Sequence, residues 1–465
     1  MPRRRGEAAI PAVRSTRVRP YHGFTGLDCR RGVHEGGLRQ AQNIDPRALP
    51  ALQTTAGVKR LKSGLPGKML SLHVLGETVL VFYQNAGAVY LLRRLPSGQE
   101  STVRMTDKDL DARRTVIPFN RYSDPADPLS GSWAHLALVY PDGLCFDPAA
   151  EAISFSPIST GAAPTITHAC VHLSRVFGAH GDRLYASGFN DPADWDLDTA
   201  ADVDGSNAWA STVQSNTRAG GDFTALCVYQ GHVLAFKRGF CHVLNNNKNP
   251  FRVADLLTVG TIDSRTVAEV NGKLLFVAED GVYRYNGDTA TRISEPLGEL
   301  LYTGAVATAA DGLYYLYTPA DGQLYVYAEE TGAWCARTPF SLGHLVGMAA
   351  AGTRCYMLSD DGSLYATGYG TRGSFTAETW PALHEELGRV CRLSLVATTE
   401  VGSRLQVKYI DQDERGTMLL AITGNDSCKR YESRAFTPAS YGGRLVFTGV
   451  GRMVVQDVQL LVAED

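Results

Sequence analysis

The stretch VNGKLLFVAEDGVYRYNG, residues 270–287, contains the pattern on which the fold of this chain depends. A Gly turn precedes an apolar strand, and a second Gly turn precedes a strand that ends in Tyr. Three further stretches follow the same plan: YQGHVLAFKRGFCHVL (229–244), AADGLYYLYTPADGQLYVYAEETGAW (309–334) and AAGTRCYMLSDDGSLYATG (350–368). The leading glycines Gly231, Gly272, Gly312 and Gly352 are 41, 40 and 40 residues apart, and Gly239, Gly281, Gly322 and Gly362 are 42, 41 and 40 apart. These two series predict a repeat of about forty residues.

Each repeat has the pattern of antiparallel β-hairpins. Apolar side chains alternate with period two, as in Leu274, Phe276 and Ala278, and Asp-Gly dipeptides favour two-residue turns in which both central residues have positive φ. Looser copies precede the clear ones. We therefore expect an all-β protein whose residues 65–375 form a β-propeller of about seven blades, with six to eight also compatible. A solenoid of the same hairpins is the alternative. Asp-Gly occurs at 142–143, 280–281, 311–312, 321–322 and 361–362.

The ends of the chain break the period. Residues 388–465 contain longer alternating strands and predict a C-terminal antiparallel β-sandwich, reached through a linker at 376–387 in which a short helix is expected. Residues 1–64 are rich in Arg and Gly, lack a helical or strand period, and are interrupted by Pro46 and Pro50. We expect an extended N-terminal arm laid across another surface.

Charge separates this arm from the body. Residues 1–62 hold 13 Lys and Arg against 4 Asp and Glu, whereas the remainder holds 32 against 44. A basic arm on an acidic body predicts contact with nucleic acid or an acidic neighbouring surface. The residues expected to make that contact are Arg3, Arg4, Arg5, Arg14, Arg17 and Arg19.

Composition indicates a soluble globular protein, with 44% apolar and 20% charged residues. The start of the chain lacks the apolar run of a secretory signal, and no stretch approaches the roughly 18 apolar residues of a membrane span. Nine scattered Cys without a C-x-x-C pair favour reduced thiols in the cytosol.

The search for chemistry gives weak candidates. His168, Cys170 and His172 would point to one face of a strand and could hold zinc or copper, although a polar strand face is the more usual explanation. GYGTRG (368–373) is interpreted as a glycine-rich loop, and DQDERG (411–416) as a hairpin turn and not a calcium loop. Motifs of serine hydrolases, zinc proteases and P-loops are missing. We expect no enzyme activity and no cofactor.

The opening region resembles the virion proteins of tailed bacteriophages, in the letters Phe24, Gly26, Leu27, Asp28, Asn43, Ile44, Pro50 and Leu52. The end of the motif departs from the family, because Gly57 precedes Lys59 and Arg60. GVYRYNGDTATRISEPLGELL (281–301) and YASGFNDPADWD (185–196) are similar to further passages of the same propellers. Within this family, the chain most resembles the tail nozzle and packaged-DNA stabilisation proteins of short-tailed phages.

This resemblance implies a structural virion protein that forms a ring, typically hexameric, in the neck or tail. Such a ring continues the DNA channel, stabilises packaged DNA and takes part in DNA ejection. Its expected partners are its own copies, portal, adaptor or other tail proteins, and double-stranded DNA in transient contact, without a membrane anchor. The protein would be assembled in the host bacterial cytoplasm. Two alternatives are a propeller glycosidase, which would use a pair of carboxylates, and a propeller module that binds glycans or proteins.

Overall fold

The fold is all-β. The computed structural model describes residues 15–20, 23–30, 36–119, 136–159, 161, 163–197, 204–211, 220–337, 343–369, 373–381, 388–433 and 436–464. The helices among them are 3-10 turns of three residues, η1 (Pro46–Ala48), η4 (Ser264–Thr266) and η5 (Glu295–Leu297). No helix in these ranges is long and apolar enough to cross a bilayer.

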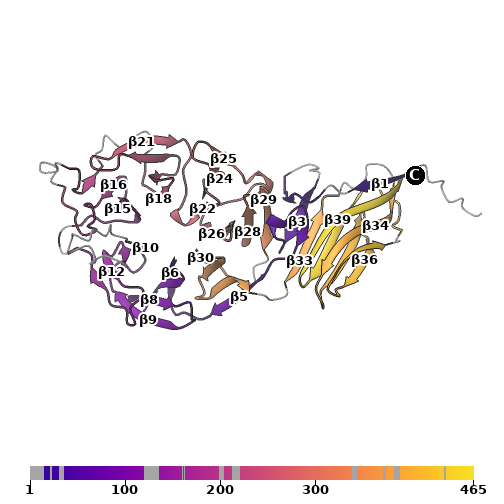
Figure 1. The fold of residues 1–465 in the computed structure, drawn as a ribbon, viewed down its shortest axis with the longest axis horizontal. Helices are drawn as coiled ribbons and strands as arrows, with labels where there is room; N and C mark the ends of the chain where they lie inside the picture. The colour runs from indigo at the N-terminus through magenta and orange to yellow at the C-terminus, as the bar shows by residue number, and fades with distance from the viewer. Residues whose placement is uncertain are drawn as a thin grey trace, which may run out of the picture.

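The larger part of the molecule is a β-propeller, whose sheets are arranged as a ring in Figure 1. Six separate four-stranded sheets and the first four strands of a ten-stranded sheet make seven such units among the described residues. They are β6–β9 (Lys68–Leu75, Thr78–Asn85, Ala88–Arg94, Glu100–Thr106), β10–β13 (Thr115–Pro118, Ala137–Tyr140, Leu144–Phe146, Ser156–Pro157), β14–β17 (His168–His172, Arg175–His180, Arg183–Ala186, Trp209–Ala210), β18–β21 (Ala225–Tyr229, His232–Phe236, Cys241–Asn245, Arg252–Leu257), β22–β25 (Ala268–Val270, Lys273–Val277, Val282–Tyr285, Ala290–Arg292), β26–β29 (Val306–Ala310, Leu313–Thr318, Gln323–Ala328, Ala333–Arg337), and β30–β32 (Leu345–Ala351, Arg354–Ser359, Leu364–Tyr369) with β5 (Gly57–Lys62).

The ring is closed by a strand from the N-terminal region. β30–β32 supply three strands of the last unit, and β5 pairs antiparallel with β32 as the fourth. On the inner side, β30 packs against β6 of the first unit. Lys62 of β5 also contacts Glu100 of β9, with 2.5 Å between Nζ and Oε2. Both ends of the propeller sequence are therefore held together by residues 57–62.

The repeat glycines form turns largely as the sequence predicts. Gly231, Gly272, Gly312 and Gly352 all have positive φ between the first and second strands of their units. The expectation for the Asp-Gly pairs holds in full only at Asp311-Gly312, where both residues have positive φ (54° and 70°). At Asp280-Gly281 neither residue has positive φ. Glycine is needed at position 281 for a different reason, since an added Cβ would lie 2.5 Å from the Ser294 hydroxyl oxygen.

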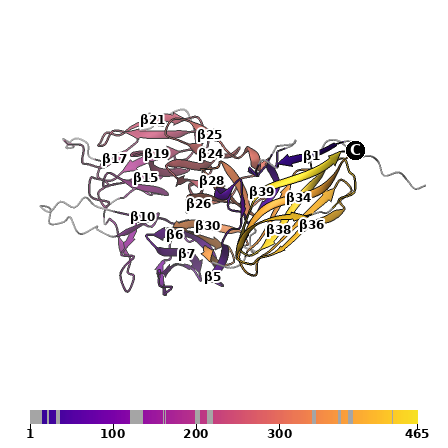
Figure 2. The same cartoon turned by 45° about the vertical axis from the view of Figure 1, so that its right-hand side comes forward.

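The C-terminal part is a two-sheet sandwich (Figure 2). One sheet has the order β33-β38-β35-β36 and the other β1-β39-β34-β37. Alternation explains the packing: Leu405, Val407 and Tyr409 of β35 are buried, and the residues between them are exposed. The strands are β1 (Ser15–Pro20), β33 (Ser374–Thr379), β34 (Gly388–Thr399), β35 (Arg404–Asp411), β36 (Gly416–Thr423), β37 (Ser427–Ser433), β38 (Gly443–Val450) and β39 (Met453–Glu464).

The linker differs from expectation. Residues 376–379 of the expected linker belong to strand β33 (Ser374–Thr379), whose first two residues fall in the range expected for the propeller, because the alternating burial of this strand fits it to the sheet beside β38. Residues 382–387 lie outside the described part of the chain.

The N-terminal region also differs from the predicted arm. β2 (Gly26–Leu27), β3 (Gly37–Gln42) and β4 (Leu52–Gln53) lie within the chain's own sheets. β3 stands between the propeller and the sandwich, parallel to β29 on one side and antiparallel to β33 on the other (Figure 1). The described residues 23–30 and 36–62 do lie across another surface, but that surface belongs to the same chain.

One hydrophobic core runs through this junction. Residues 23–62 contribute Phe24, Leu27, Leu38, Ala41, Ile44, Leu49 and Leu52, all buried, to a cluster that also holds Trp334 of β29 and Phe447 of β38. Phe24 meets Phe447 edge to face at 5.6 Å between ring centroids. Burial of these side chains stabilises the two parts as one body.

We predict that Leu38→Ala lowers the free energy of unfolding by about 2–5 kcal/mol, because it removes a fully buried side chain from this core. The matched control is Arg39→Ala at the next position, whose exposed ion pair with Glu378 is worth at most about 1 kcal/mol. Urea unfolding of both variants measures the difference. Equal, small losses would show that β3 is not part of the core.

Candidate functional site

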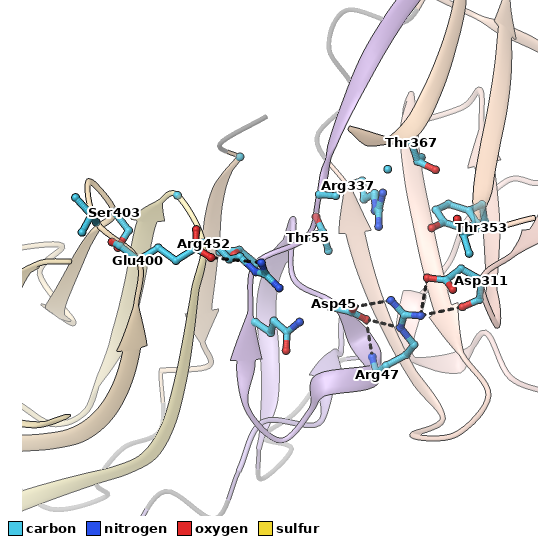
Figure 3. Close-up of a pocket in the computed structure, with 18 residues that line it drawn as sticks. Asp45, Arg47, Thr55, Asp311, Arg337, Thr353, Thr367, Glu400, Ser403 and Arg452 are labelled. Atoms are coloured by element: carbon cyan, nitrogen blue, oxygen red, sulfur yellow. Dashed lines mark hydrogen bonds and ion pairs between the residues drawn. The ribbon is translucent and has the colours of Figure 1, made fainter. Parts of the chain in front are cut away.

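A cavity of about 450 Å³ lies where the propeller, the N-terminal segment and the sandwich meet (Figure 3). The propeller supplies residues of the β26–β32 region, and the N-terminal segment supplies its turns on either side of β4. The sandwich supplies two turns, at 400–403 and 451–452. The polar side chains that line the cavity are Asp45, Arg47, Gln53, Thr54, Thr55, Asp311, Tyr315, Arg337, Thr353, Thr367, Glu400, Ser403 and Arg452.

Arg47 holds two carboxylates in this cavity. Its backbone N–H and its guanidinium both donate to Asp45, at 3.0 Å from N and Nε to Oδ1 and 2.8 Å from Nη2 to Oδ2. The remaining nitrogen, Nη1, donates to the Asp311 carboxylate at 2.8 Å and to the Asp311 carbonyl at 2.9 Å. The hydrogen bond that the guanidinium donates to Asp45 is the main cause that raises the pKa of Arg47, although burial opposes it. Arg47 thus fastens the N-terminal segment to the β26–β27 turn.

Arg337, at the end of β29, is the unusual residue of the cavity. Its side chain is 7% exposed, and neither Nε nor Nη1 has a hydrogen-bond partner. The guanidinium carbon lies 5.1 Å from the centre of the Tyr315 ring, which holds the side chain in place by a cation–π contact. Figure 3 shows Arg337 between Thr55 and Thr353. Nε and Nη1 each have less than 1 Å² of accessible surface, so these two nitrogens do not open onto the cavity. A buried cation with unsatisfied donors is costly unless a ligand completes it.

The sandwich side of the cavity is more open. Glu400 and Arg452 pair at 3.3 Å, with 57% and 77% of their side chains exposed. Val401 beside them is 63% exposed and adds an apolar surface at the rim.

The structure places the sequence-predicted residues elsewhere. Arg3, Arg4, Arg5 and Arg14 lie outside the described residues. The backbone of Arg17 and Arg19 belongs to β1, which pairs with β39 at the edge of the sandwich (Arg17 with Val462, Arg19 with Leu460). Arg17 and Arg19 are not among the residues that line the cavity, and the contacts of all six arginines stay a prediction.

His168, Cys170 and His172 are all on β14, as the sequence predicts. Cys170 is buried in an apolar cluster with Phe177 and Val233, and burial raises the pKa of its thiol. Burial lowers the pKa of both His168 and His172. Among the described residues, no group of three or more His, Cys, Asp and Glu side chains could hold a metal ion.

Two loop interpretations can also be placed. DQDERG connects β35 to β36 as a hairpin turn, in which the Asp411 carboxylate accepts the N–H groups of Asp413 and Arg415. Of GYGTRG, residues 370–372 lie outside the described part.

A second cavity, of about 400 Å³, is lined by the first strands of propeller units, including β6, β10, β14, β26 and β30. An ion-pair network stands beside it. Asp263 accepts from Arg265 and, at 2.7 Å, from Arg113 of a different unit. Arg265 in turn donates to the Val346 carbonyl at 2.8 Å. No Asp or Glu is among the described residues that line this cavity.

The signal that sequence reasoning missed is Asp-x-Arg. It occurs five times in the sequence. At Asp28-Arg30, Asp45-Arg47 and Asp263-Arg265 the Arg backbone and guanidinium bind the same carboxylate. In the other two, Asp111-Arg113 and Asp413-Arg415, the Arg113 guanidinium binds Asp263 and the Arg415 N–H binds Asp411. The pattern closes a tight turn, and in two cases it leaves Nη1 to reach another segment.

Comparisons with known proteins give a likeness in fold. No protein-family model and no curated protein matches the chain. Similar solved structures include a catalytically inactive virginiamycin B lyase from Staphylococcus aureus with quinupristin (7% identity, 67% of this chain and 98% of that chain, TM-score 0.45). Others are YCF48 from Cyanidioschyzon merolae (12%, 67% and 98%, TM-score 0.42) and BamB from Moraxella catarrhalis (12%, 69% and 98%, TM-score 0.38).

We predict that the Asp263 network makes stability depend on acid pH. Burial alone would raise the pKa of Asp263, but the hydrogen bond from Arg265 and the charges of Arg265 and Arg113 outweigh it and lower the pKa to about 2. Since the folded pKa lies below the unfolded value, the stabilisation is complete above about pH 5 and is lost as the pH falls towards 2. It amounts to about 2 kcal/mol at pH 5 and roughly half of that at pH 3.

The test is urea unfolding at pH 5 and pH 3 for the wild type and Asp263→Asn, which keeps an acceptor for the Arg265 N–H. The wild type should lose about 1 kcal/mol more than the variant. Asp288→Asn, in an exposed turn, is the control and should behave as the wild type. Parallel pH dependence of all three proteins would contradict the prediction.

Proposed function

We propose that this protein is a non-enzymatic structural component of a tailed-phage virion, which forms a ring in the neck or tail and stabilises packaged DNA. The main support for the proposal is the position of the residues in the opening region that resemble the phage proteins. Phe24, Leu27, Ile44 and Leu52 are buried in the core that joins propeller to sandwich. The resemblance thus concerns residues with a definite physical task, and not an arbitrary surface sequence.

Asn43 illustrates that task. Its φ is 57°, a conformation that Asn tolerates better than most residues. The Asn43 N–H donates to the Ala336 carbonyl of β29 at 2.8 Å, and Nδ2 donates to the Ser374 carbonyl of β33 at 2.7 Å. One residue of the phage-like motif therefore bonds to the propeller on one side and to the sandwich on the other.

A second phage-like passage, 281–301, contacts the first. It forms β24, β25 and η5, and the Pro296 carbonyl accepts the Cys29 N–H at 2.6 Å. Trp334, buried under the same region, donates from Nε1 to the Ile293 carbonyl at 2.8 Å. Two stretches that resemble the same phage family thus contact each other in the folded chain. This contact supports the proposal that the chain shares the propeller-and-sandwich architecture of that family.

The basic N-terminus gives the proposed ring its partners. Residues 15–20 pair with β39 at the edge of the sandwich as β1, and Arg3, Arg4, Arg5 and Arg14 precede them in the sequence. We propose that these residues contact a neighbouring copy, a portal or adaptor ring, or the terminal DNA. Arginine suits each surface, because it pairs with carboxylates and phosphates.

We predict that the full chain assembles into a ring, alone or on a portal or adaptor ring, and that a variant lacking residues 1–14 stays folded but fails to assemble. Removal of residues 1–20 should in addition cost stability, since it strips β1 from β39. Mass in solution, with and without the rings, measures assembly. A monomer that is indifferent to both truncations and to the rings would overturn the proposal.

The proposed contact with DNA can be tested separately, with a control for net charge. Substitution of Arg3, Arg4 and Arg5 by Ser should weaken salt-dependent binding to duplex DNA. Substitution of Arg104, Arg238 and Arg415, which are 61–72% exposed on the body, removes the same charge and should leave binding unchanged. Equal effects would assign binding to net charge and not to the arm.

A further inference from the structure

We propose that strand β36 of the sandwich pairs edge to edge with β36 of a second copy of this chain, so that two copies are joined through one continuous sheet. The inference rests on β36 and stands apart from the proposed function. Three observations carry it: the free edge of β36, the lack of charged side chains along it, and the opposite charges at its two ends.

The first observation is the position of β36. It is the last strand of the ten-stranded sheet, at the end away from the propeller (Figure 1 and Figure 2). β36 pairs with β35 on one side, in two regular parts that a bulge at Leu419 separates. Among the described residues, no backbone group outside β35 bonds to the backbone of β36. Because an antiparallel strand directs its N–H and C=O groups alternately to its two sides, the outward groups of β36 are open to another strand.

The second observation is the composition of this edge. β36 has the sequence GTMLLAIT, eight residues without a charge or Pro. Met418 is 42% exposed and Ala421 is exposed as well, whereas Leu419 and Ile422 are buried in the core. Charged side chains and Pro are the usual means by which an edge strand avoids pairing with another chain. β36 has neither.

The other outer edges of the molecule are protected. In the propeller, β13 and β17 are two residues long, and β5, β9, β21 and β25 carry charged side chains. In the sandwich, β37 carries Lys429, Arg430 and Glu432, and β1 has the sequence STRVRP. The first strands of the propeller units pack against one another around the axis. Among the described strands, β36 is therefore the long edge that is open to a partner.

The third observation is the charge at the two ends of β36, which identifies the partner. Arg415 precedes the strand with 72% of its side chain exposed, and Asp426 follows it in an exposed turn. When two β36 strands pair antiparallel, the start of each lies beside the end of the other, so Arg415 of each copy comes near Asp426 of the other. The other acids of the first turn have partners in their own copy: Asp413 lies 3.5 Å from Arg415, and Glu414 is bound by Arg444. Two copies of β36 are therefore complementary to each other about a two-fold axis.

The mass of the full chain in solution, measured by sedimentation at increasing concentration, tests this pairing. We expect the mass to double as the concentration rises. Ala421→Lys should weaken this step at least tenfold, because it places a charge on the exposed edge of both copies. Gln406→Lys is the matched control and should associate as the wild type. Gln406 is exposed and lies opposite Ala421 on β35, one strand away from the edge.

Charge reversal tests the antiparallel arrangement. Arg415→Asp and Asp426→Arg should each weaken the pairing several-fold, because each brings like charges together at both ends. An equal mixture of the two variants should restore it, since every Arg then meets an Asp of the other copy. Asp426 has a φ of 54° and accepts the Val401 N–H, so urea unfolding checks that Asp426→Arg is folded. If it is not, Ala421→Lys still decides.

The variant that lacks residues 1–14 separates this contact from the proposed ring. It should pair through β36 as the full chain does, because β36 is not part of the arm. If the full chain forms a ring, the same contact should join two rings, and Ala421→Lys should return the mass to that of one. A mass that does not rise with concentration, equal association of Ala421→Lys and the wild type, or no recovery in the mixture of folded variants would overturn the proposal. Loss of the pairing on removal of residues 1–14 would contradict it as well.

Discussion

The structure depends on one strand, β3, which fills the space between two sheets that could not otherwise be continuous. β29 ends the sixth propeller unit and β33 begins the sandwich, and β3 pairs with both. The result is a ten-stranded sheet that runs from β26 to β36. β3 pairs with β29 at Gln42 and with β33 along Leu38–Gln42, and β2 pairs with the start of β3. The same N-terminal segment then closes the propeller as β5.

The propeller could be predicted from the sequence, and the junction could not. In the repeats, both the period of the glycines and the alternation of residues such as Leu274 and Phe276 follow from local hairpin geometry. β3 has the sequence GLRQAQ, and it is buried because sheets more than 290 residues away in the chain cover it on either side. The local sequence pattern does not predict this burial, because Leu38 and Ala41 are the only apolar side chains of β3. The sequence predicts an extended segment on another surface, whereas the described residues of the segment form strands in the chain's own sheets.

The candidate site has the same origin. Arg47 and Arg337 are 290 positions apart, and only the insertion of residues 23–62 brings them to one cavity. Asp-x-Arg predicts the local fork of Arg47 on Asp45, because it is set within three residues. No sequence pattern predicts that Nε and Nη1 of Arg337 lack hydrogen-bond partners. Their state depends on the acceptors that the propeller, the N-terminal segment and the sandwich place around them. The two structural roles of the segment, closing a ring and joining two domains, thus leave one buried cation, Arg337, beside the cavity.

The central claim is that residues 23–30 and 36–62 are an integral part of the folded body. Native-state hydrogen exchange on the full chain tests it most directly. The account predicts that amides of β3 and β5 exchange as slowly as those of their partners β33 and β32, through opening of the whole body. Exchange of β3 and β5 at rates near those of an unfolded chain, with β33 and β32 still protected, would show a loosely attached arm and contradict the account.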